Sequence, residues 1–461
     1  MAIIKAYTLP HPPVAVPAVG RGQEKEIGKT LAAFDEVASE IAALAPETIV
    51  YITPHNVLYA DYFHISPGPS ASGDFSRFGA RGVGLEAKYD EEFIVAITRL
   101  ADENGFPAGT RGGKDANLDH GVAVPMWFIN RRYPEYRTVR ASQSGLNPSE
   151  HYMFGQLIAK AAEITGRKTV LIASSDLSHK LTNDGPYGFA GEGPVFDEMI
   201  VKALADGDFL ALFRIPDDLR ECAAECGYNS LMILAGCFDR RKVEPRLLSY
   251  EGTFGVGYAI ASFTPGDPDP GRNILDLYSE LSLEDAARRR ESEDDYRALA
   301  RLSLEYKIKT GRELPLPNGL PEELLKNRAG VFVSLHKNGR LRGCVGTIAP
   351  TTASIAREII QNAVSAGLGD NRFEAVTEKE LPYLTYKVDV LSDPEPVSGP
   401  EELDVKRYGV IVTCGYRRGL LLPNLDGIDT VGEQISIARR KAGISEREEV
   451  KLERFEVVRH E

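Results

Sequence analysis

Four histidines stand at positions where a folded chain builds a reactive site. His11 lies in "LPHPP", His55 in "TPHN", His120 in "LDHG" and His179 in "SSDLSH". Each lies in a loop or at the end of a strand-like run, and the prolines beside the first two stiffen the backbone that carries them. A neutral imidazole is the commonest metal ligand and titrates near neutral pH. The four residues therefore indicate a metal site with proton-transferring groups beside it.

The first two histidines are the candidate metal ligands. His11 and His55 each follow a proline, and an ion held by both would need a third ligand. Two histidines and one carboxylate leave positions open for substrate and oxygen, as in non-heme Fe(II) oxygenases. Glu225 precedes an apolar helix-like run and Glu251 opens a glycine-rich strand-like run, and either carboxylate fits. If one ion binds both histidines, their ligand nitrogens must lie about 3 Å apart.

The remaining histidines of the first half are expected to differ in role. His120 and His179 are placed farther from the ion, within hydrogen-bond reach of a bound substrate, where imidazole acts as an acid or base. His64 in "YFHIS" and His151 in "SEHYM" are interpreted as a strand residue and a helix-start residue without chemistry.

The segment that carries these histidines alternates short β-rich runs with amphipathic stretches. The β-rich runs are "AIIKAY", "ETIVYIT", "YRTVRASQ", "KTVLIASS" and "YAIASF", and helix-like runs include "IGKTLAAFDEVASEIAALA" and "YMFGQLIAKAAEIT". This alternation predicts an α/β domain with a largely parallel or mixed central sheet. In such sheets ligands bind beyond the carboxyl ends of the strands, where the histidines are expected to meet.

The length of the chain and a stretch rich in proline and glycine predict two domains. The chain has 461 residues, too many for one ordinary core. The stretch "TPGDPDPGRN" at 264–273 alternates proline, glycine and aspartate, which is typical of a connection. We therefore place a first domain at 1–265, a linker at 266–289 and a second domain at 290–461.

Charge and cysteine usage limit the partners and the compartment. The net charge of −13 disfavours nucleic acid as a general partner. Five scattered cysteines without a CxxC pair indicate a reducing compartment. Neither a membrane-length apolar run nor a signal-like N-terminus is present, so a cytoplasmic protein without membrane contact is expected. The oligomeric state stays open.

The second domain is predicted to be α+β. "AGVFVSLHKNGRLRGCVGTI" reads as two strands joined by a turn at Asn338-Gly339, and "TTASIAREIIQNAVSAGL" reads as a helix. Arg342 and Cys344 alternate with glycines on the second strand. Either the cysteine is packed and inert, or the arginine makes its thiolate more nucleophilic beside glycines that admit a ligand.

The histidine motifs carry a family resemblance. Taken in order over roughly 265 residues, "LPHPP", "TPHN", "DHG" and "SSDLSH" resemble the LigB-like class III extradiol dioxygenases and the related MEMO-like proteins. The resemblance implies Fe(II) held by His11, His55 and a glutamate, which favours Glu225 over Glu251. It also implies that His179 and His120 act as acid and base. In the MEMO branch a cysteine-glycine pair occupies the third-ligand region, and here Cys226-Gly227 follows Glu225 directly; a thiolate would favour zinc or copper.

The second domain resembles another family. "LRGCVGT", "DNRFEAVTEKEL", "VDVLSDPEPV" and "YGVIVTCGYRRGLLLP" follow in the order of the AMMECR family. The fusion of the two domains is similar to the A component of the so-called AmmeMemoRadiSam system, which implies a radical S-adenosylmethionine partner protein.

Three hypotheses about function follow from the sequence. The first is a metal-dependent ring-cleavage dioxygenase that acts on a small catecholic or other aromatic substrate. The second is a metal-binding component of a modification system without dioxygenase activity. The third is a binding scaffold whose surfaces act in place of the pocket.

Overall fold

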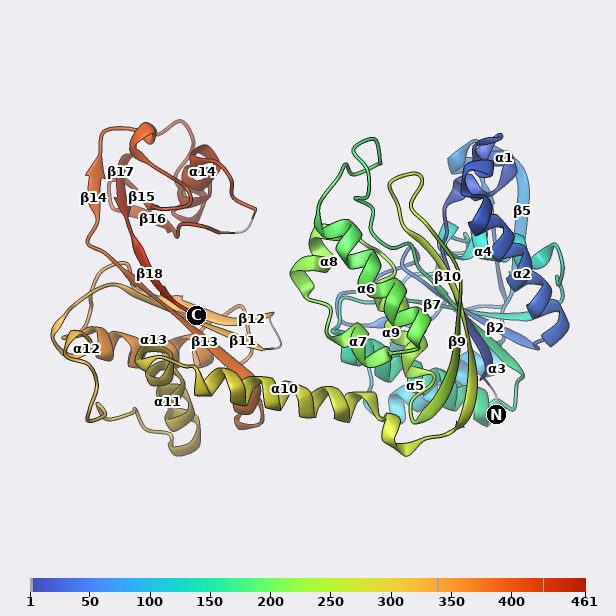
Figure 1. The fold of residues 1–461 in the computed structure, drawn as a ribbon, viewed down its shortest axis with the longest axis horizontal. Coiled ribbons are helices and arrows are strands. Elements are labelled where there is room, and N and C mark those ends of the chain that lie inside the picture. Colours follow the sequence, from blue (N-terminus) through green and yellow to red (C-terminus); the bar gives the residue numbers. More distant parts are fainter. Residues whose placement is uncertain (1–2, 338–339, 426) are drawn as a thin grey trace. The chain divides into compact units, whose positions relative to one another are not determined.

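The computed structural model describes residues 3–337, 340–425 and 427–461, and the chain forms two compact units (Figure 1). Unit 1 ends at Tyr278, and unit 2 is Ser279–Glu461. The predicted turn at Asn338-Gly339 lies outside the described residues.

In the structure, regular elements occupy most of the predicted linker at 266–289. Strand β10 (Tyr258–Pro268) continues into this segment, and helix α10 (Ile274–Glu291) occupies most of the rest. Prolines are tolerated at the end of β10 because the strand pairs with β1 only as far as Phe263, and beyond it with β9 alone. A proline, which has no N–H to donate, then costs no ladder hydrogen bond on the open side.

Unit 1 is built on a mixed six-stranded sheet in the order β7-β2-β8-β1-β10-β9. The four strands from β7 to β1 are parallel, whereas β10 runs antiparallel to both of its neighbours. Every residue of β2 and β8 is buried, as expected for strands covered on both faces. The predicted α/β class is thereby confirmed. The sheet comprises β1 (Ile3–Leu9), β2 (Thr48–Thr53), β7 (Arg137–Ser142), β8 (Thr169–Ser174), β9 (Arg241–Glu251) and β10.

Helices cover both faces of this sheet (Figure 1). Helices α2 (Gly28–Leu44) and α4 (His120–Asn130) pack together on one face, and α5 (Pro148–Thr165) packs with its neighbours on the other. The start of α5 follows from a capping box between Asn147 and Glu150. The other helices of unit 1 are α1 (Pro17–Gly20), α3 (Glu91–Glu103), α6 (Glu192–Asp206), α7 (Phe209–Phe213), α8 (Asp217–Ala223) and α9 (Tyr228–Gly236).

Short strands complete unit 1 beside the main sheet. They form two pairs, β3 (Phe63–His64) with β6 (Ala108–Gly109), and β4 (Ser70–Phe75) with β5 (Ala80–Lys88). Because β1, β2 and β8 are parallel, the residues that follow Leu9, Thr53 and Ser174 emerge at the same edge of the main sheet. That edge carries the histidines.

Unit 2 contains two four-stranded antiparallel sheets, in the orders β12-β11-β13-β18 and β14-β17-β15-β16. Helices α11 and α13 pack on the first sheet and α14 on the second, which confirms the predicted α+β class. The strands are β11 (Val331–Lys337), β12 (Arg340–Gly346), β13 (Leu384–Leu391), β14 (Glu395–Val397), β15 (Gly409–Cys414), β16 (Arg417–Leu421), β17 (Lys451–Phe455) and β18 (Val457–His460). The helices are α11 (Asp295–Thr310), α12 (Glu322–Lys326), α13 (Ile355–Leu368) and α14 (Val431–Lys441).

Each unit has its own buried apolar core. Among the described residues, no helix combines the length and the apolar character needed to cross a membrane.

Candidate metal centre

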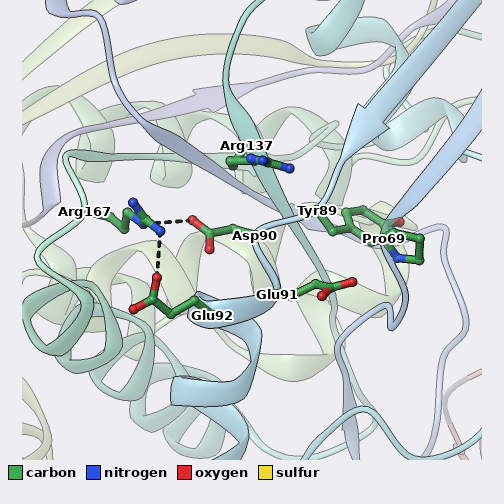
Figure 2. A pocket seen from close by; sticks show the side chains of 7 residues that line it. All are labelled: Pro69, Tyr89, Asp90, Glu91, Glu92, Arg137 and Arg167. Carbon is green, nitrogen blue, oxygen red and sulfur yellow. Dashed lines mark hydrogen bonds and ion pairs between the residues drawn. The ribbon is translucent and has the colours of Figure 1, made fainter.

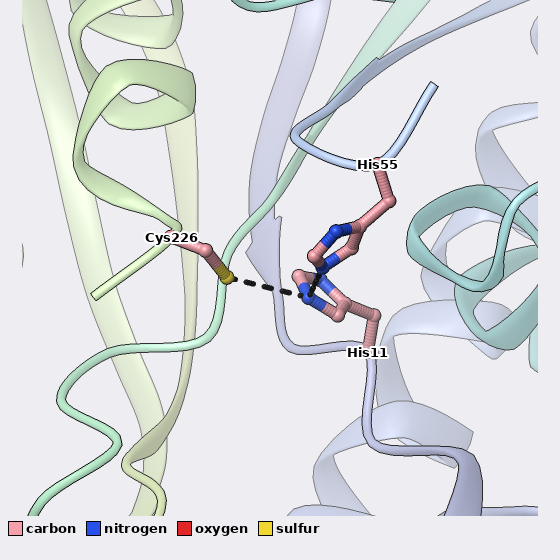
Figure 3. Close-up of side chains that lie close together, drawn as sticks. All are labelled: His11, His55 and Cys226. Carbon is pink, nitrogen blue, oxygen red and sulfur yellow. Dashed lines mark hydrogen bonds between the residues drawn. The ribbon is translucent and has the colours of Figure 1, made fainter. Parts of the chain in front are cut away.

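Three potential ligand atoms converge at the carboxyl edge of the unit 1 sheet (Figure 3). The Nε2 atoms of His11 and His55 lie 3.0 Å apart. Cys226 Sγ lies 3.5 Å from His11 Nε2, and the three ligand atoms all lie within 4.8 Å of one another. The nitrogen separation matches the value of about 3 Å expected for two ligands of one ion. A small cation fits between these three atoms.

The orientation of His11 is fixed by the strand that lies beside it. Its Nδ1 lies 2.8 Å from the hydroxyl oxygen of Ser174, and Ser174 is the last residue of β8. That hydroxyl donates its own hydrogen to the carbonyl of Gly121 at 2.5 Å. The serine oxygen therefore accepts from His11 Nδ1–H, which leaves the lone pair of Nε2 directed at the cluster. A hydrogen bond of this kind is the usual way in which proteins select the metal-binding nitrogen.

All the imidazoles of the cluster are held neutral. Burial, followed by the neighbouring His55, lowers the pKa of His11 well below its ordinary value. Burial likewise lowers the pKa of His55 and of His120 to about 4. The side chain of His55 remains exposed, so the cluster is open to solvent on that side. Neutral imidazoles have the free lone pairs that metal binding requires.

The third group at the cluster is a thiol. Cys226 lies two residues before α9, and its carbonyl accepts a hydrogen bond of 2.9 Å from the buried side chain of Gln143, which follows β7. Burial, with the nearby charge of Asp176, raises the pKa of the Cys226 thiol well above its ordinary value. Binding of a divalent cation would therefore release the thiol proton, as thiolate ligation generally does.

In the structure the carboxylate of Glu225, which the sequence favoured as the third ligand, is held by other partners. Its Oε2 accepts a hydrogen bond of 2.7 Å from the backbone N–H of Tyr228, and its Oε1 lies 3.5 Å from Arg220 Nε. A carboxylate that follows a helix in sequence and precedes the next one is drawn to the unpaired N–H groups of the new helix. Glu225 thus stabilises the start of α9, and the adjacent Cys226 faces the histidines.

Glu251 is also engaged elsewhere. It ends β9, whereas the sequence predicted that it opens a strand. Its Oε2 accepts hydrogen bonds of 2.7 Å from both the backbone N–H and the hydroxyl of Thr30, at the start of α2. Its role in the structure is to hold that helix end.

The structure brings His120 and His179 to the same cluster. The ring of His120 stacks on that of His55 at a centroid distance of 4.1 Å, and His179 Nε2 lies 3.9 Å from Cys226 Sγ. His120 is the first residue of α4, whereas the sequence placed it in a loop. Aromatic side chains flank both histidines, since Phe78 lies edge-on to His120 and the exposed Tyr187 stacks on His179.

A buried network positions the elements that carry His55 and His120. The Thr53 hydroxyl donates to Asp119 Oδ1 at 2.5 Å and accepts from the backbone N–H of His55 at 3.2 Å. Asp119 also caps α4. Arg140 is fully buried and donates to the carbonyls of the loop before Asp119, which fixes that loop against β7.

Sequence reasoning missed Asp176. Its Oδ1 accepts a hydrogen bond of 2.7 Å from the backbone N–H of His11, and its Oδ2 lies 3.6 Å from His11 Nε2. Burial raises the pKa of Asp176 to about 7. A signal for it is present in "SSDLSH", where an aspartate follows a buried strand three residues before His179. His64 and His151 lie in β3 and in the first turn of α5, as the sequence indicated.

Gly227 sets how closely α9 approaches the end of β8. A Cβ at this position would meet Ser175 Cβ at 2.4 Å and the carbonyl oxygen of Asp176 at 2.7 Å. We expect Gly227→Ala to push Cys226 away from the histidines and to lower metal affinity roughly tenfold, the size typical of altered ligand support. Chelator competition measures this. Gly28→Ala, at a helical glycine with open space around it, is the matched control; equal affinities for the two variants would contradict the expectation.

The candidate groups of unit 2 have other partners. Arg342 forms a two-pronged ion pair with Glu380, at 3.1 and 3.2 Å. Cys344 Sγ accepts a hydrogen bond of 3.2 Å from the Ser334 hydroxyl. Arg342 therefore stabilises the fold through Glu380, and its proposed action on the Cys344 thiol has no support in these contacts.

The ion pair of Arg342 gives unit 2 an acid-sensitive element. Burial alone would raise the pKa of Glu380. The hydrogen bonds from Arg342, Thr377 and Lys337 outweigh burial and lower this pKa to about 2. The unfolded chain then binds this proton more tightly, so the contribution of Glu380 is complete above about pH 4.5 and is lost as pH falls toward 2. We expect hydrogen-exchange protection of β12 to decline in that window. Glu380→Gln should flatten the decline and the exposed Glu378→Gln should leave it unchanged.

A pocket of about 360 Å³ lies at the opposite edge of the unit 1 sheet, where β7 and β8 begin (Figure 2). Three of its charged groups pair with one another, since Arg167 lies 3.4 Å from Asp90 and 2.7 Å from Glu92. Asp90 also caps α3. These contacts give Arg167, Asp90 and Glu92 a role in stabilising the fold.

The mixed α/β sheet and the cluster at its carboxyl edge define unit 1 as an α/β domain with a candidate metal site, followed by a separate α+β domain. A family model described as the catalytic LigB subunit of aromatic ring-opening dioxygenase matches residues 5–261, and an AMMECR1 model matches residues 297–460. The chain therefore belongs to the LigB family and carries an AMMECR1 domain, which confirms both resemblances.

Proteins of other organisms are similar to the whole chain or to about a third of it. Protein CA_C1420 of Clostridium acetobutylicum is 42% identical, over 100% of this chain and 99% of its own length. A Thermotoga maritima protein is 50% identical over 34% of this chain and 91% of its own. A crystal structure of the Pyrococcus horikoshii protein PH0010 covers 37% of this chain and 91% of its own, at 30% identity and a TM-score of 0.34.

Proposed function

We propose that unit 1 is a metal-dependent enzyme of the aromatic ring-opening type, with His11, His55 and Cys226 as the metal ligands. The observation that carries this proposal is the convergence of their three ligand atoms at the carboxyl edge of a LigB-family sheet. Fe(II) is the metal that the family implies. When bound, it would supply a charged centre that lowers the pKa of a phenolic oxygen.

The residues around the ligands provide proton transfer and orientation. Burial lowers the pKa of His179, so its imidazole is neutral at pH 7 and can accept a proton from a phenol. His120 stacks on His55 and presents a second neutral imidazole beside the same point. The Phe78 and Tyr187 rings next to these two histidines provide apolar surface for a small aromatic substrate.

Oxygen uptake tests the proposal directly. The full chain is loaded with Fe(II) without air, its iron is quantified, and it is then mixed with air and a panel of catechols. Oxygen consumption, together with the visible absorbance of a ring-opened product, supports the proposal. The His179→Gln variant should keep its iron and lose most of the rate, typically 100-fold or more for a general base. An iron-loaded protein that consumes no oxygen with any catechol contradicts it.

The thiol at the third position favours a second candidate function. Cys226 replaces the carboxylate of a two-histidine, one-carboxylate site, and thiolate selects softer ions such as zinc or copper. Under this alternative, unit 1 is a metal-binding component of a modification system that works with a radical S-adenosylmethionine protein. Zinc or copper retained in stoichiometric amount, with no oxygen chemistry, would favour it over the first.

A further inference from the structure

A pocket of about 320 Å³ in unit 2 contains polar groups that the described residues leave unused. It lies where α10, the start of α11 and strand β13 meet. Its walls are formed by Ala286, Arg289, Arg290, Ser292, Glu293, Arg297, Leu384, Thr385, Tyr386, Lys387 and Glu461. The α10 part of this wall lies between the two segments that the family models match, 5–261 and 297–460.

Three buried donors in this wall have no hydrogen-bond acceptor among the described residues: the Tyr386 hydroxyl and the Nε–H groups of Arg290 and Arg297. The side chain of Tyr386 is only 3% exposed, yet its hydroxyl has no hydrogen-bond partner in the described part of the chain. The Nε–H of Arg290 is buried in the same wall and also lacks a partner within residues 3–337, 340–425 and 427–461, although the NH2 group of Arg290 donates to the carbonyl of Leu381 at 2.7 Å. A buried donor without an acceptor is unfavourable, so the Tyr386 hydroxyl and the Arg290 Nε–H indicate an acceptor supplied from outside the chain.

The charges of the pocket favour an anion. Its lining includes four cations, Arg289, Arg290, Arg297 and Lys387, and two carboxylates, Glu293 and Glu461. Both carboxylates are already paired, Glu293 with Arg301 at 2.8 Å and Glu461 with Lys387 at 2.6 Å. Arg297 is paired with Asp294 at 3.5 Å, and Arg290 with Glu305 at 3.6 Å. Arg289 is exposed and has no ion pair within the described part of the chain.

Beside the pocket, one edge of strand β13 has backbone groups that do not pair with another described strand. Strand β18 pairs only with Val388–Leu391 of β13. The preceding segment, Leu384–Lys387, pairs with β11 on one side, and no strand of the described residues pairs with it on the side where β18 has ended. A ligand in the pocket therefore lies beside both unpaired side-chain donors and a free strand edge.

We propose that this pocket binds a small, multiply charged oxyanion, of the phosphate or dicarboxylate class. The Tyr386 hydroxyl and Arg290 Nε–H donate to its oxygens, and Arg289 supplies the unpaired positive charge. The proposal concerns unit 2 alone and does not depend on the metal centre or its chemistry.

Calorimetric titration of the full chain tests the proposal, with inorganic phosphate and succinate as the two charged probes and glucose as the neutral probe. We expect one or both anions, and not glucose, to bind with millimolar or tighter affinity. The stronger of the two anions identifies the ligand class. The His11→Ala variant should bind the same anion equally well, which excludes the metal centre as the binding site.

Variants of the donors make the test specific. Tyr386→Phe keeps the buried ring and removes the hydroxyl, so the fold is retained and affinity should fall roughly tenfold, as for a hydrogen bond to a charged group. Arg289→Gln should weaken binding severalfold, whereas Arg312→Gln, at an exposed arginine outside the pocket lining, should not. Absence of binding to wild type, or equal losses in the Arg289 and Arg312 variants, would overturn the proposal.

Discussion

The His11→Ala variant is expected to lose stoichiometric metal binding. His11 supplies the most central atom of the cluster, since its Nε2 lies 3.0 Å from His55 Nε2 and 3.5 Å from Cys226 Sγ. Its ring is also prepared for this role by the hydrogen bond to Ser174. Loss of supporting groups outside the ligand set typically costs 10–100-fold in metal affinity, so loss of the ligand should cost at least roughly a hundredfold.

Metal content after equilibrium dialysis, followed by chelator competition, measures this effect. His336→Ala removes a half-buried histidine from unit 2 and serves as the matched control, because it should leave the metal content unchanged. The alanine substitution also removes a fully buried side chain, so the melting temperature without metal is compared as well. A His11→Ala protein that keeps one equivalent of metal would eliminate this site.

The second large effect is expected at Cys226, with Glu225 as its direct comparison. Cys226→Ser replaces a soft sulfur with a hard oxygen and should lower affinity for zinc or copper roughly a hundredfold, while affinity for Fe(II) falls less. Glu225→Gln keeps an acceptor for the N–H of Tyr228 and loses the charge opposite Arg220. It should retain full metal affinity and lose about 1–2 kcal/mol of stability.

These adjacent substitutions separate a ligand from a helix-stabilising residue. Parallel titrations with zinc and Fe(II), together with urea unfolding, give the affinities and the free energies of unfolding. Retained zinc affinity in Cys226→Ser combined with lost affinity in Glu225→Gln would assign the ligand role to the carboxylate after all.

The sequence predicted the sheet and the position of the histidines because both depend on local patterns. Uniformly apolar runs such as "TIVYIT" mark buried parallel strands, and residues that follow such strands meet at one edge. His11, His55 and His179 could therefore be assigned to one site without coordinates.

The choice between Glu225 and Cys226 could not be made in this way. The two residues are neighbours, so a small rotation of the chain before α9 exchanges which of them faces the histidines. That rotation is set by Arg220 and by the N–H of Tyr228, which hold the carboxylate away from the cluster. Asp176 was missed for a related reason, since its contact with the site is a hydrogen bond from the backbone N–H of His11, 165 residues away in the sequence.

The end of β10 is a case in which the local sequence pattern indicates a connection and the structure has a strand. Prolines at 265 and 268 are typical of a connection, and only the pairing of β10 with β9 at those positions reveals a strand. Whether a proline costs a hydrogen bond depends on which strands lie beside it. A single sequence does not show which strands are neighbours.

The wide separation of His11, His55 and Cys226 along the chain has a consequence for how the protein is made. Residues 11 and 55 leave the ribosome early, but the cysteine follows more than 150 residues later. Strand β1, which leads into His11, lies between β8 and β10, so its place in the sheet is completed only after residue 268 has been synthesised. The three-atom cluster is therefore absent from a nascent chain until more than half of it has been translated. Metal acquisition would thus be a late event in the synthesis of this protein, after unit 1 has closed.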